Sequence, residues 1–490
     1  MPSASTSPPV ADTLAALLSG LRDRGDHPLL ICDDSRISYA EAEIRSASVA
    51  RGLIQLGAGK GTHVGLLYPN GVDFVVAMLA AARIGAVVVP YSTFFTAAEL
   101  NTQLRDSDTA ILMSARSYRN HDYAQRLSGI DGPCLRHVVF EMPRADVPAL
   151  AEFEDDVDGC DPLAIVYTSG STGPPKGAVH THASLIGHQR NLNTIRGLTS
   201  SDRLFCNSPF FWIGGFAFGL LATMSAGATL ICSNATDPAL TLDLIEAERP
   251  TVTNGFVAGI AHLTHHPSYP GRNFTARRGN LYPIMAPDVR PRDPELRHNM
   301  LGMTESGSVV LLDGDETDQP EHRRGSYGRP APGFETKLLE TGELCIRGPH
   351  MMQGYYGHSR EDCFDPDGWF HTGDLVRVDR DGYFYFLGRA GSMIKTAGAN
   401  VTPGEVEKAL ATLGFSAHVL GLPDAMRGQT VAAVIVTETP VDFDAIRQAL
   451  RDMLSAYKIP RKFAVCPPAE LPTLSSGKVD MPALVRLFDV

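Results

Sequence analysis

One segment of the chain combines hydroxyls, glycines and a lysine in a pattern that suits a phosphate group. It runs from Ile165 to Val179 and reads IVYTSGSTGPPKGAV. Glycines let backbone N–H groups approach an anion closely, hydroxyls add donors, and Lys176 adds a positive charge. The segment is not a Walker A loop, because that motif has Gly directly before Lys and Pro175 stands there. Because so many hydroxyl, glycine and lysine residues follow a buried strand, a phosphate-binding loop is favoured over a flexible surface loop.

Four later motifs also carry residue types that could do chemistry. They are LGMTES at 301–306, DGWFHTGDL at 367–375, FLGRAGSMIK at 386–395 and LPTLSSGKV at 471–479. A carboxylate such as Glu305, beside a triphosphate, is a hard oxygen ligand suited to Mg²⁺. Asp374 is a second carboxylate, which can accept hydrogen bonds, and Lys478 supplies a positive charge in a Gly-containing loop. Taken singly, these residues could equally be a helix cap, a turn aspartate and a solvated lysine.

In this order, the five motifs resemble those of the adenylate-forming superfamily, which includes acyl- and aryl-CoA synthetases, peptide-synthetase adenylation domains and beetle luciferases. The resemblance extends from about residue 37 to about residue 485. It implies binding of ATP, Mg²⁺ and coenzyme A. The implied nucleotide-binding residues are Thr168, Ser169, Gly170, Ser171, Thr172, Gly173, Lys176, Ala286, Pro287, Leu301, Gly302, Asp374 and Arg389.

The same resemblance implies a role for each catalytic residue. Thr304 would contact the phosphate and Glu305 would hold the metal. Lys478 would enter the active site for adenylate formation. Lys395 would serve the second half-reaction after the small domain rotates about a hinge at Gly391.

The matching acid pocket begins at residues 209–216 and includes residues 254–259, which are aromatic or small and almost uncharged. The expected pocket residues are Phe211, Trp212, Gly215, Phe216, Phe256, Ala258 and Gly259. Amino-acid-activating relatives have an aspartate near position 212 for the substrate's ammonium. Since a buried ammonium without a carboxylate is costly, Trp212 favours an apolar carboxylic acid that is alkyl, alicyclic or aromatic. For any single aromatic side chain, core packing is the alternative.

Three positions depart from the family pattern. Leu301 stands where an aromatic ring usually stacks on adenine. The linker 288–300 is shorter than usual and normally carries a helix. Gly391 replaces the usual Asp or Lys at the hinge, and Gly is freer in both states.

The elements that must position these residues follow from hydrophobic periodicity. Helical patterns at 39–56 and 74–84 alternate with short strands at 62–67, 86–90, 164–167 and 229–231, which predicts an α/β fold with a largely parallel sheet. From residue 325, strands at 337–339, 343–347, 375–378 and 383–387 predict a β-rich subdomain. After Gly388, a helix at 403–413, a strand at 432–437 and a helix at 443–457 predict a small mixed domain.

The domain organisation follows from these changes. We expect a disordered tail at 1–15, a large α/β N-terminal domain at 16–388 with its β-rich subdomain at 325–388, a hinge at 389–391 and a mobile α+β C-terminal domain at 392–490.

Composition narrows the class of protein. The 490 residues carry 43 basic and 55 acidic side chains, a net charge of −12, which argues against a general nucleic-acid binder. No apolar run is long enough for a membrane span, and no secretory signal is visible. Eight scattered cysteines without metal-ligand spacing fit reduced thiols in a cytoplasmic protein. His262, His265 and His266 lie close together, but a solvated helix end is favoured over a metal site.

The expected function is therefore ATP-dependent ligation of a carboxylic acid to coenzyme A. Residues 421–429 and 457–462 resemble CoA ligases. A carrier protein acting in trans is the alternative acceptor. A non-catalytic nucleotide-binding relative, or transfer of the acyl group to an amine or to oxygen chemistry, remains open.

Overall fold

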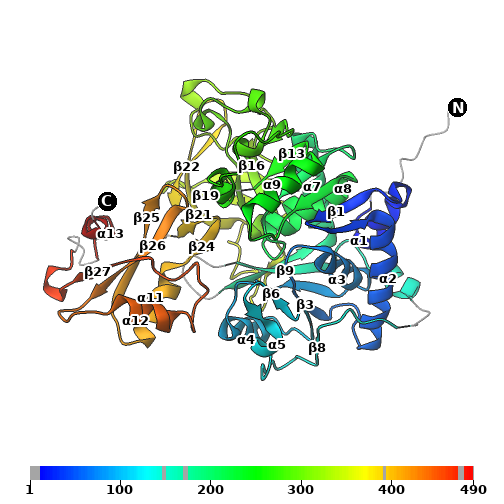
Figure 1. The fold of residues 1–490 in the computed structure, drawn as a ribbon, viewed down its shortest axis with the longest axis horizontal. Helices are drawn as coiled ribbons and strands as arrows, with labels where there is room; N and C mark the ends of the chain where they lie inside the picture. Colours follow the sequence, from blue (N-terminus) through cyan, green and yellow to red (C-terminus); the bar gives the residue numbers. More distant parts are fainter. Residues whose placement is uncertain are drawn as a thin grey trace.

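The computed structural model describes the chain except for residues 1–10, 146–149, 169–174, 256, 390–392, 473–478 and 489–490, and it leaves the side chains of 258, 388, 389 and 482 undescribed. Two sheets, each with helices beside it, form the bulk of the large domain (Figure 1). No helix within the described parts of the chain is both long and apolar enough to cross a membrane.

The first large sheet is seven-stranded and parallel at its centre. Its order is β20 (Gly354–Tyr355), β10 (Lys176–Thr181), β9 (Pro162–Thr168), β4 (Val87–Pro90), β3 (His63–Leu67), β5 (Ile111–Ser114) and β8 (His137–Val139). Strands β3, β4 and β9 run parallel, whereas β10 pairs antiparallel with both β9 and β20. The central strands are buried continuous apolar runs, as expected of parallel strands covered on both faces.

The second large sheet has six strands. Its order is β14 (Arg278–Gly279), β13 (Val252–Asn254), β11 (Arg203–Cys206), β12 (Thr229–Cys232), β1 (Pro28–Cys32) and β2 (Ser35–Ser38). All of its pairings are parallel except that between β1 and β2, which form a hairpin.

Helices cover these sheets and fill the space between them. Those of the large domain are α1 (Leu14–Gly20), α2 (Tyr39–Gln55), α3 (Val72–Arg83), α4 (Ala97–Asp106), α5 (Tyr123–Arg126), α6 (Leu150–Asp155), α7 (His182–Arg196), α8 (Ala222–Ala226), α9 (Pro238–Glu248) and α10 (Ala261–Thr264). Capping boxes fix where α2 and α4 begin, at Ser38 with Glu41 and at Thr96 with Glu99.

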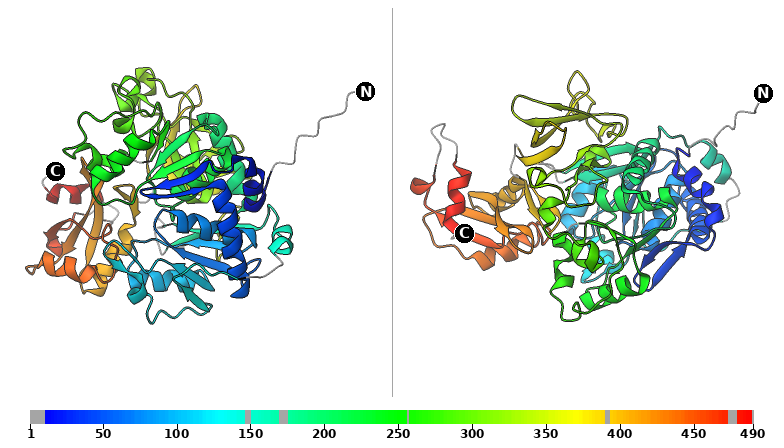
Figure 2. Two further views of the ribbon diagram at one scale, coloured as in Figure 1. Left: turned by 45° about the vertical axis from the view of Figure 1, so that its right-hand side comes forward. Right: turned by 90° about the horizontal axis from the view of Figure 1, so that it is seen from above.

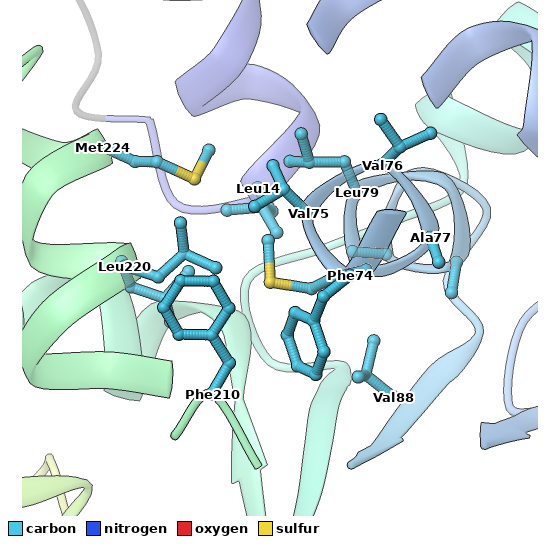
Figure 3. Packing of buried hydrophobic residues seen from close by; sticks show 14 of the residues in the cluster. Leu14, Phe74, Val75, Val76, Ala77, Leu79, Val88, Phe210, Leu220 and Met224 are labelled. Carbon is cyan, nitrogen blue, oxygen red and sulfur yellow. The ribbon is translucent and has the colours of Figure 1, made fainter. Parts of the chain in front are cut away.

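The main core centres on α3. Nearly all of its residues are buried, as expected of a helix that is apolar on every side. Its cluster combines Val88 of β4 with Leu230 of β12, so it joins the two large sheets. Figure 3 shows Phe74 of α3 packed near Phe210, with Leu14, Leu220 and Met224 around them.

Two smaller sheets follow. One has three strands, β15 (Leu301–Met303), β16 (Ser308–Leu312) and β17 (Arg329–Pro330). The other has four, β18 (Glu335–Leu338), β19 (Glu343–Arg347), β21 (Phe370–Val378) and β22 (Phe384–Arg389). A short hairpin of β6 (Ser117–Tyr118) and β7 (His121–Asp122) lies apart from these sheets. The strands predicted between 337 and 387 are thus confirmed, and β21 begins earlier than expected.

The small C-terminal domain has its own sheet and core. The sheet contains β24 (Ala399–Val401), β23 (Ile394–Thr396), β26 (Gly428–Val436) and β25 (Ala417–Asp424), with β27 (Lys462–Cys466) parallel to β26. Helices α11 (Pro403–Thr412), α12 (Phe443–Leu450) and α13 (Met481–Val485) complete it. This domain lies beside the large one in all three views (Figures 1 and 2). The mixed α/β architecture predicted from periodicity is confirmed.

Candidate active site

The expected phosphate loop joins two paired strands of the first large sheet. β9 ends at Thr168 and β10 begins at Lys176, and these two residues are register partners across the antiparallel pair. Ser169, Gly170, Ser171, Thr172 and Gly173 lie outside the described residues. The strand predicted to enter the loop is confirmed as β9.

The TES residues form a short 3₁₀ turn, η7 (Thr304–Ser306), between β15 and β16. Glu305 is half-buried, and its Oε1 accepts a 2.6 Å hydrogen bond from Tyr355 Oη in β20. The Glu305 carbonyl accepts a 2.8 Å bond from the backbone N–H of Met352. Lys176 Nζ lies 5.0 Å from the centre of the Tyr355 ring. Tyr355 therefore links the lysine of the phosphate loop to the carboxylate expected to hold the metal.

The buried side chain of His180 in β10 holds the same turn through a hydrogen bond. Its Nε2 lies 2.7 Å from the Thr304 carbonyl oxygen, to which it donates. Complete burial lowers the pKa of His180 to about 4, although the bond to Thr304 opposes the shift. The ring is thus neutral at physiological pH and acts as a fixed donor.

The residues expected around the nucleoside come from four separate segments. Asp374 is 4% exposed and pairs with Arg389 in the register of β21 and β22. Leu301 is buried in β15, with exposed Gly302 beside it. The segment 286–300 contains only the short 3₁₀ turns η5 (Pro287–Val289) and η6 (Pro294–Leu296). Ala286, just before η5, donates its backbone N–H to the Ala276 carbonyl. The linker therefore lacks the helix that the family usually has there.

A cavity of about 640 Å³ lies where the two domains meet. The large domain contributes Phe94, Trp212, Asn254 and Gly259, and the small domain contributes residues 396–399 and Tyr457. Neither domain forms this cavity alone.

Aromatic side chains form one part of the cavity wall. Trp212 and Phe94 line it, with ring centres 6.1 Å apart. The Phe211 ring lies 5.5 Å from that of Trp212 but is not among the lining residues. Gly215 is required nearby, because a Cβ there would meet the Pro209 carbonyl at 2.1 Å. Phe216 lies in the main core against Phe74 and is not among the lining residues. Phe256, and the side chain of Ala258, lie outside the described residues.

Four arginines also line the cavity, and no described lining residue is acidic. They are Arg126, Arg427, Arg451 and Arg461. Arg451 and Arg461 are exposed, so this part of the wall faces solvent. Within the described parts of the chain, none of the four has an ion-pair partner. The combination suits a ligand with an apolar end and a polyanionic end.

Lys395 lies in β23 at the start of the hairpin whose residues 396–399 line the cavity. Its Nζ is 5.0 Å from the centre of the Phe386 ring in β22, so it reaches the large domain. The Arg389 side chain and Gly391 lie outside the described residues.

Lys478 also lies outside them. Leu471 and Val479 pack with Leu420 and Leu422 on one face of the C-terminal sheet. Val419, from the same strand, faces the other cluster, against which Tyr457 packs. Helix α13 accordingly lies on the side of the small domain away from the large one (Figure 1). This arrangement presents the Lys395 hairpin to the cavity and places Leu471, Val479 and α13 on the other face of the C-terminal sheet.

Sequence reasoning missed Tyr355, His180 and the arginines. Tyr355 and His180 sit in short strands with no distinctive spacing. The arginines come from separate segments that only the domain contact brings together.

Comparison with known proteins gives two matches along the chain. A model of AMP-binding enzymes matches residues 19–356, and a model of the AMP-binding enzyme C-terminal domain matches residues 405–478. The chain is 31% identical to a 3-[(3aS,4S,7aS)-7a-methyl-1,5-dioxo-octahydro-1H-inden-4-yl]propanoyl:CoA ligase of Mycobacterium tuberculosis, covering 96% of this chain and 98% of the relative. It is 32% identical to a feruloyl-CoA synthase of an Amycolatopsis species, covering 90% and 92%.

Solved structures match over nearly the full length. A fatty acyl CoA synthetase of Mycobacterium tuberculosis is 26% identical with a TM-score of 0.64, covering 97% of this chain and 98% of the other. The o-succinylbenzoate CoA synthetase of Bacillus subtilis, bound to a product analogue, has a TM-score of 0.77 at 24% identity, covering 97% and 98%.

Proposed function

Because this chain belongs to the AMP-binding enzyme family, we propose that it is an AMP-forming carboxylic acid–CoA ligase acting on an apolar acid. The observation that carries the proposal is the cavity between the domains, which is aromatic around Trp212 and lined elsewhere by four arginines. Relatives that match nearly the whole chain are named as a CoA ligase and a CoA synthase, which supports the same reaction.

The first step would form an acyl-adenylate. A carboxylate oxygen of the acid attacks the α-phosphorus of ATP, and pyrophosphate leaves as the P–O bond to the β-phosphate breaks. Backbone N–H groups of residues 169–173 and the Lys176 ammonium would hold the leaving phosphates. Lys478 would stabilise the charge that develops on the reacting oxygens.

The donor groups present fit magnesium. Glu305 supplies one half-buried carboxylate, and the described residues hold no cluster of three or more His, Cys, Asp or Glu ligands. Such a site suits an ion that takes one protein carboxylate and completes its shell with phosphate oxygens and water. When bound, Mg²⁺ would offset the charge of the triphosphate. Tyr355 would orient Glu305 toward it through the 2.6 Å hydrogen bond.

The second step would transfer the acyl group to a thiol. The sulfur attacks the adenylate's carbonyl carbon, the thiol proton is lost, and the C–O bond to AMP breaks. Asp374 and Arg389 would hold the ribose of the leaving AMP. The Lys395 hairpin is already at the cavity wall, so this arrangement of the domains fits acyl transfer.

The two substrates of this step match different parts of the wall. No described residue of the wall carries a carboxylate to pair with an ammonium, so an α-amino acid is disfavoured. The four arginines, which have no ion-pair partner among the described residues, favour coenzyme A, whose nucleotide end carries three phosphate groups, because Arg binds phosphate bidentately.

The test is pyrophosphate release from Mg·ATP with a panel of alkyl, alicyclic, aryl and amino acids, with and without coenzyme A. We expect release with apolar acids only, and an acyl-CoA mass when CoA is present. Release without any acyl-CoA would favour a carrier protein or another acceptor. No release with any acid would contradict the proposal and favour a non-catalytic nucleotide-binding protein.

A further inference from the structure

A buried lysine joins the two domains through carboxylates on both sides. Lys458 of the small domain has a side chain 3% exposed. Its Nζ lies 3.0 Å from Oε1 of Glu99 in α4 of the large domain and 2.8 Å from Oε1 of Glu405 in α11 of its own domain. One ammonium is therefore shared between an inter-domain and an intra-domain partner.

Glu99 is bound from both domains as well. Within the large domain it accepts a 2.8 Å hydrogen bond from the backbone N–H of Thr96, closing the capping box of α4. From the small domain, Ser455 donates its hydroxyl to Oε2 at 2.7 Å. The carboxylate thus holds both Ser455 and Lys458 at fixed positions relative to α4.

The residues between these two contacts belong to the cavity wall. Ser455, Ala456 and Tyr457 all line it. The Tyr457 ring lies 6.1 Å from the Phe94 ring of the large domain, and Phe94 in turn contacts Trp212. A shift of Ser455 or Lys458 would therefore move the wall beside the expected acid site.

The ion pair between Glu99 and Lys458 can also be broken without leaving either charged group unpaired. Burial opposes the charged form of Lys458, but Tyr457, Glu99 and Glu405 together raise its pKa above the ordinary value, so it is an ammonium. If the domains separate, Lys458 keeps Glu405, and Glu99 keeps the N–H of Thr96. An unpaired buried charge would make separation costly, and here each group retains a partner in its own domain.

We infer that Glu99 and Lys458 are positioning residues for acyl transfer, because they align the small domain so that residues 455–457 and the Lys395 hairpin complete the cavity. The inference rests on the proposed function. Adenylate formation would use Lys478 in the other domain arrangement expected from the sequence, so it does not need this contact. Loss of the contact should therefore slow one half-reaction and spare the other.

The experiment compares Glu99→Gln with Glu405→Gln. Each variant removes one carboxylate charge at similar distance from the same ammonium, but only Glu99 crosses the domain boundary. Glutamine can still close a capping box, so α4 keeps its start. For wild type and both variants, pyrophosphate release without thiol reports adenylation, and the conversion of supplied acyl-adenylate and CoA to acyl-CoA reports transfer. Thermal unfolding reports general stability.

We expect Glu99→Gln to slow transfer about tenfold or more, the change that corresponds to a loss of roughly 1.4 kcal/mol, with adenylation within about twofold of wild type. Glu405→Gln should change the two rates by the same small factor. Equal effects of Glu99→Gln on both steps, or equal transfer rates in the two variants, would overturn the inference. Failure of wild type to form acyl-CoA would instead contradict the proposed function, so the two failures are distinguishable.

Discussion

In the proposed reaction Glu305 binds Mg²⁺. At the residue scale, its ability to do so depends on the groups that fix its position as well as on the carboxylate itself. Tyr355 Oη binds its side chain, and Met352 N–H binds its carbonyl. His180 holds the preceding carbonyl, that of Thr304. These contacts fix both the backbone and the carboxylate of the turn.

Removal of the tyrosine hydroxyl should weaken the first step. Tyr355→Phe loses a hydrogen bond to a charged group, worth about 1.5–3 kcal/mol, so we expect adenylation to fall about tenfold with a raised KM for Mg·ATP. Transfer from supplied acyl-adenylate should be unchanged. Tyr356→Phe is the matched control, because its hydroxyl donates a 2.7 Å bond to Asp108 instead. Equal adenylation rates in the two variants would refute the role of Tyr355.

Trp212 gives a second prediction at this scale. The chain has two tryptophans, and Trp369 lies in β-rich structure against Arg347. In a Trp369→Phe background, we expect the fluorescence of Trp212 to change when an apolar acid binds. Trp212→Ala should raise the KM for the acid about tenfold or more, since a large aromatic contact is lost, with the KM for CoA little changed. An unaltered acid KM would exclude Trp212 from the acid site.

At the element scale, β10 and α7 bury three histidines whose pKa values are far below normal. Burial lowers the pKa of His180 and His182 to about 4 and that of His188 to about 3. The unfolded chain binds these protons near pH 6.5, so it holds more protons than the folded state as pH falls from about 6.5 to about 4. Stability is present above this window and is lost within it.

We therefore expect the urea midpoint to fall steeply between about pH 6.5 and pH 4. His188→Gln should flatten the slope, because one titrating group is removed while the amide can still donate to the Val309 carbonyl that His188 binds at 2.8 Å. At 1.36 kcal/mol per pKa unit, His180 and His182 contribute up to about 3 kcal/mol each and His188 up to about 5 kcal/mol. A slope unchanged by His188→Gln would show that this histidine does not titrate in the window.

Element prediction from the sequence succeeded where one periodicity dominated. The helix expected at 39–56 is α2, and the strand at 343–347 is β19. The helix expected at 443–457 ends at Leu450. Leu454 is buried in the segment that follows, so its apolar side chain fits the helical spacing without belonging to the helix. The π-helix η2 (Gly214–Leu221) carries no periodic signal of its own.

At the scale of the whole molecule, the candidate site contains two kinds of residue. Some belong to motifs that the sequence predicts, and others come together only where the two domains meet. Of the motif residues, Lys176 begins β10, Thr304 and Glu305 form a turn, and Asp374 lies in the middle of β21, while their roles stay predictions. The Glu99–Lys458 contact joins residues 359 positions apart, and no local sequence pattern predicts such a pair.

The two lysines expected to alternate give a prediction for the molecule as a whole. Lys478→Ala should abolish adenylate formation but spare thioester formation from supplied acyl-adenylate. Lys395→Ala should slow mainly the second step, since Lys395 begins the hairpin at the cavity. Separate assays of pyrophosphate release and acyl-CoA formation decide this. An equal loss of both steps in Lys478→Ala would contradict the use of two domain arrangements.

The arginines of the cavity stand out against the charge of the chain as a whole. The protein carries a net charge of −12, but at physiological ionic strength charges more than about 8 Å from a polyanionic acceptor are largely screened, so they neither attract nor repel it strongly. Within that range Arg126, Arg427, Arg451 and Arg461 dominate the local field. The acceptor is therefore captured at contact and not steered from afar, and added salt should speed its dissociation far more than it alters the frequency of encounters.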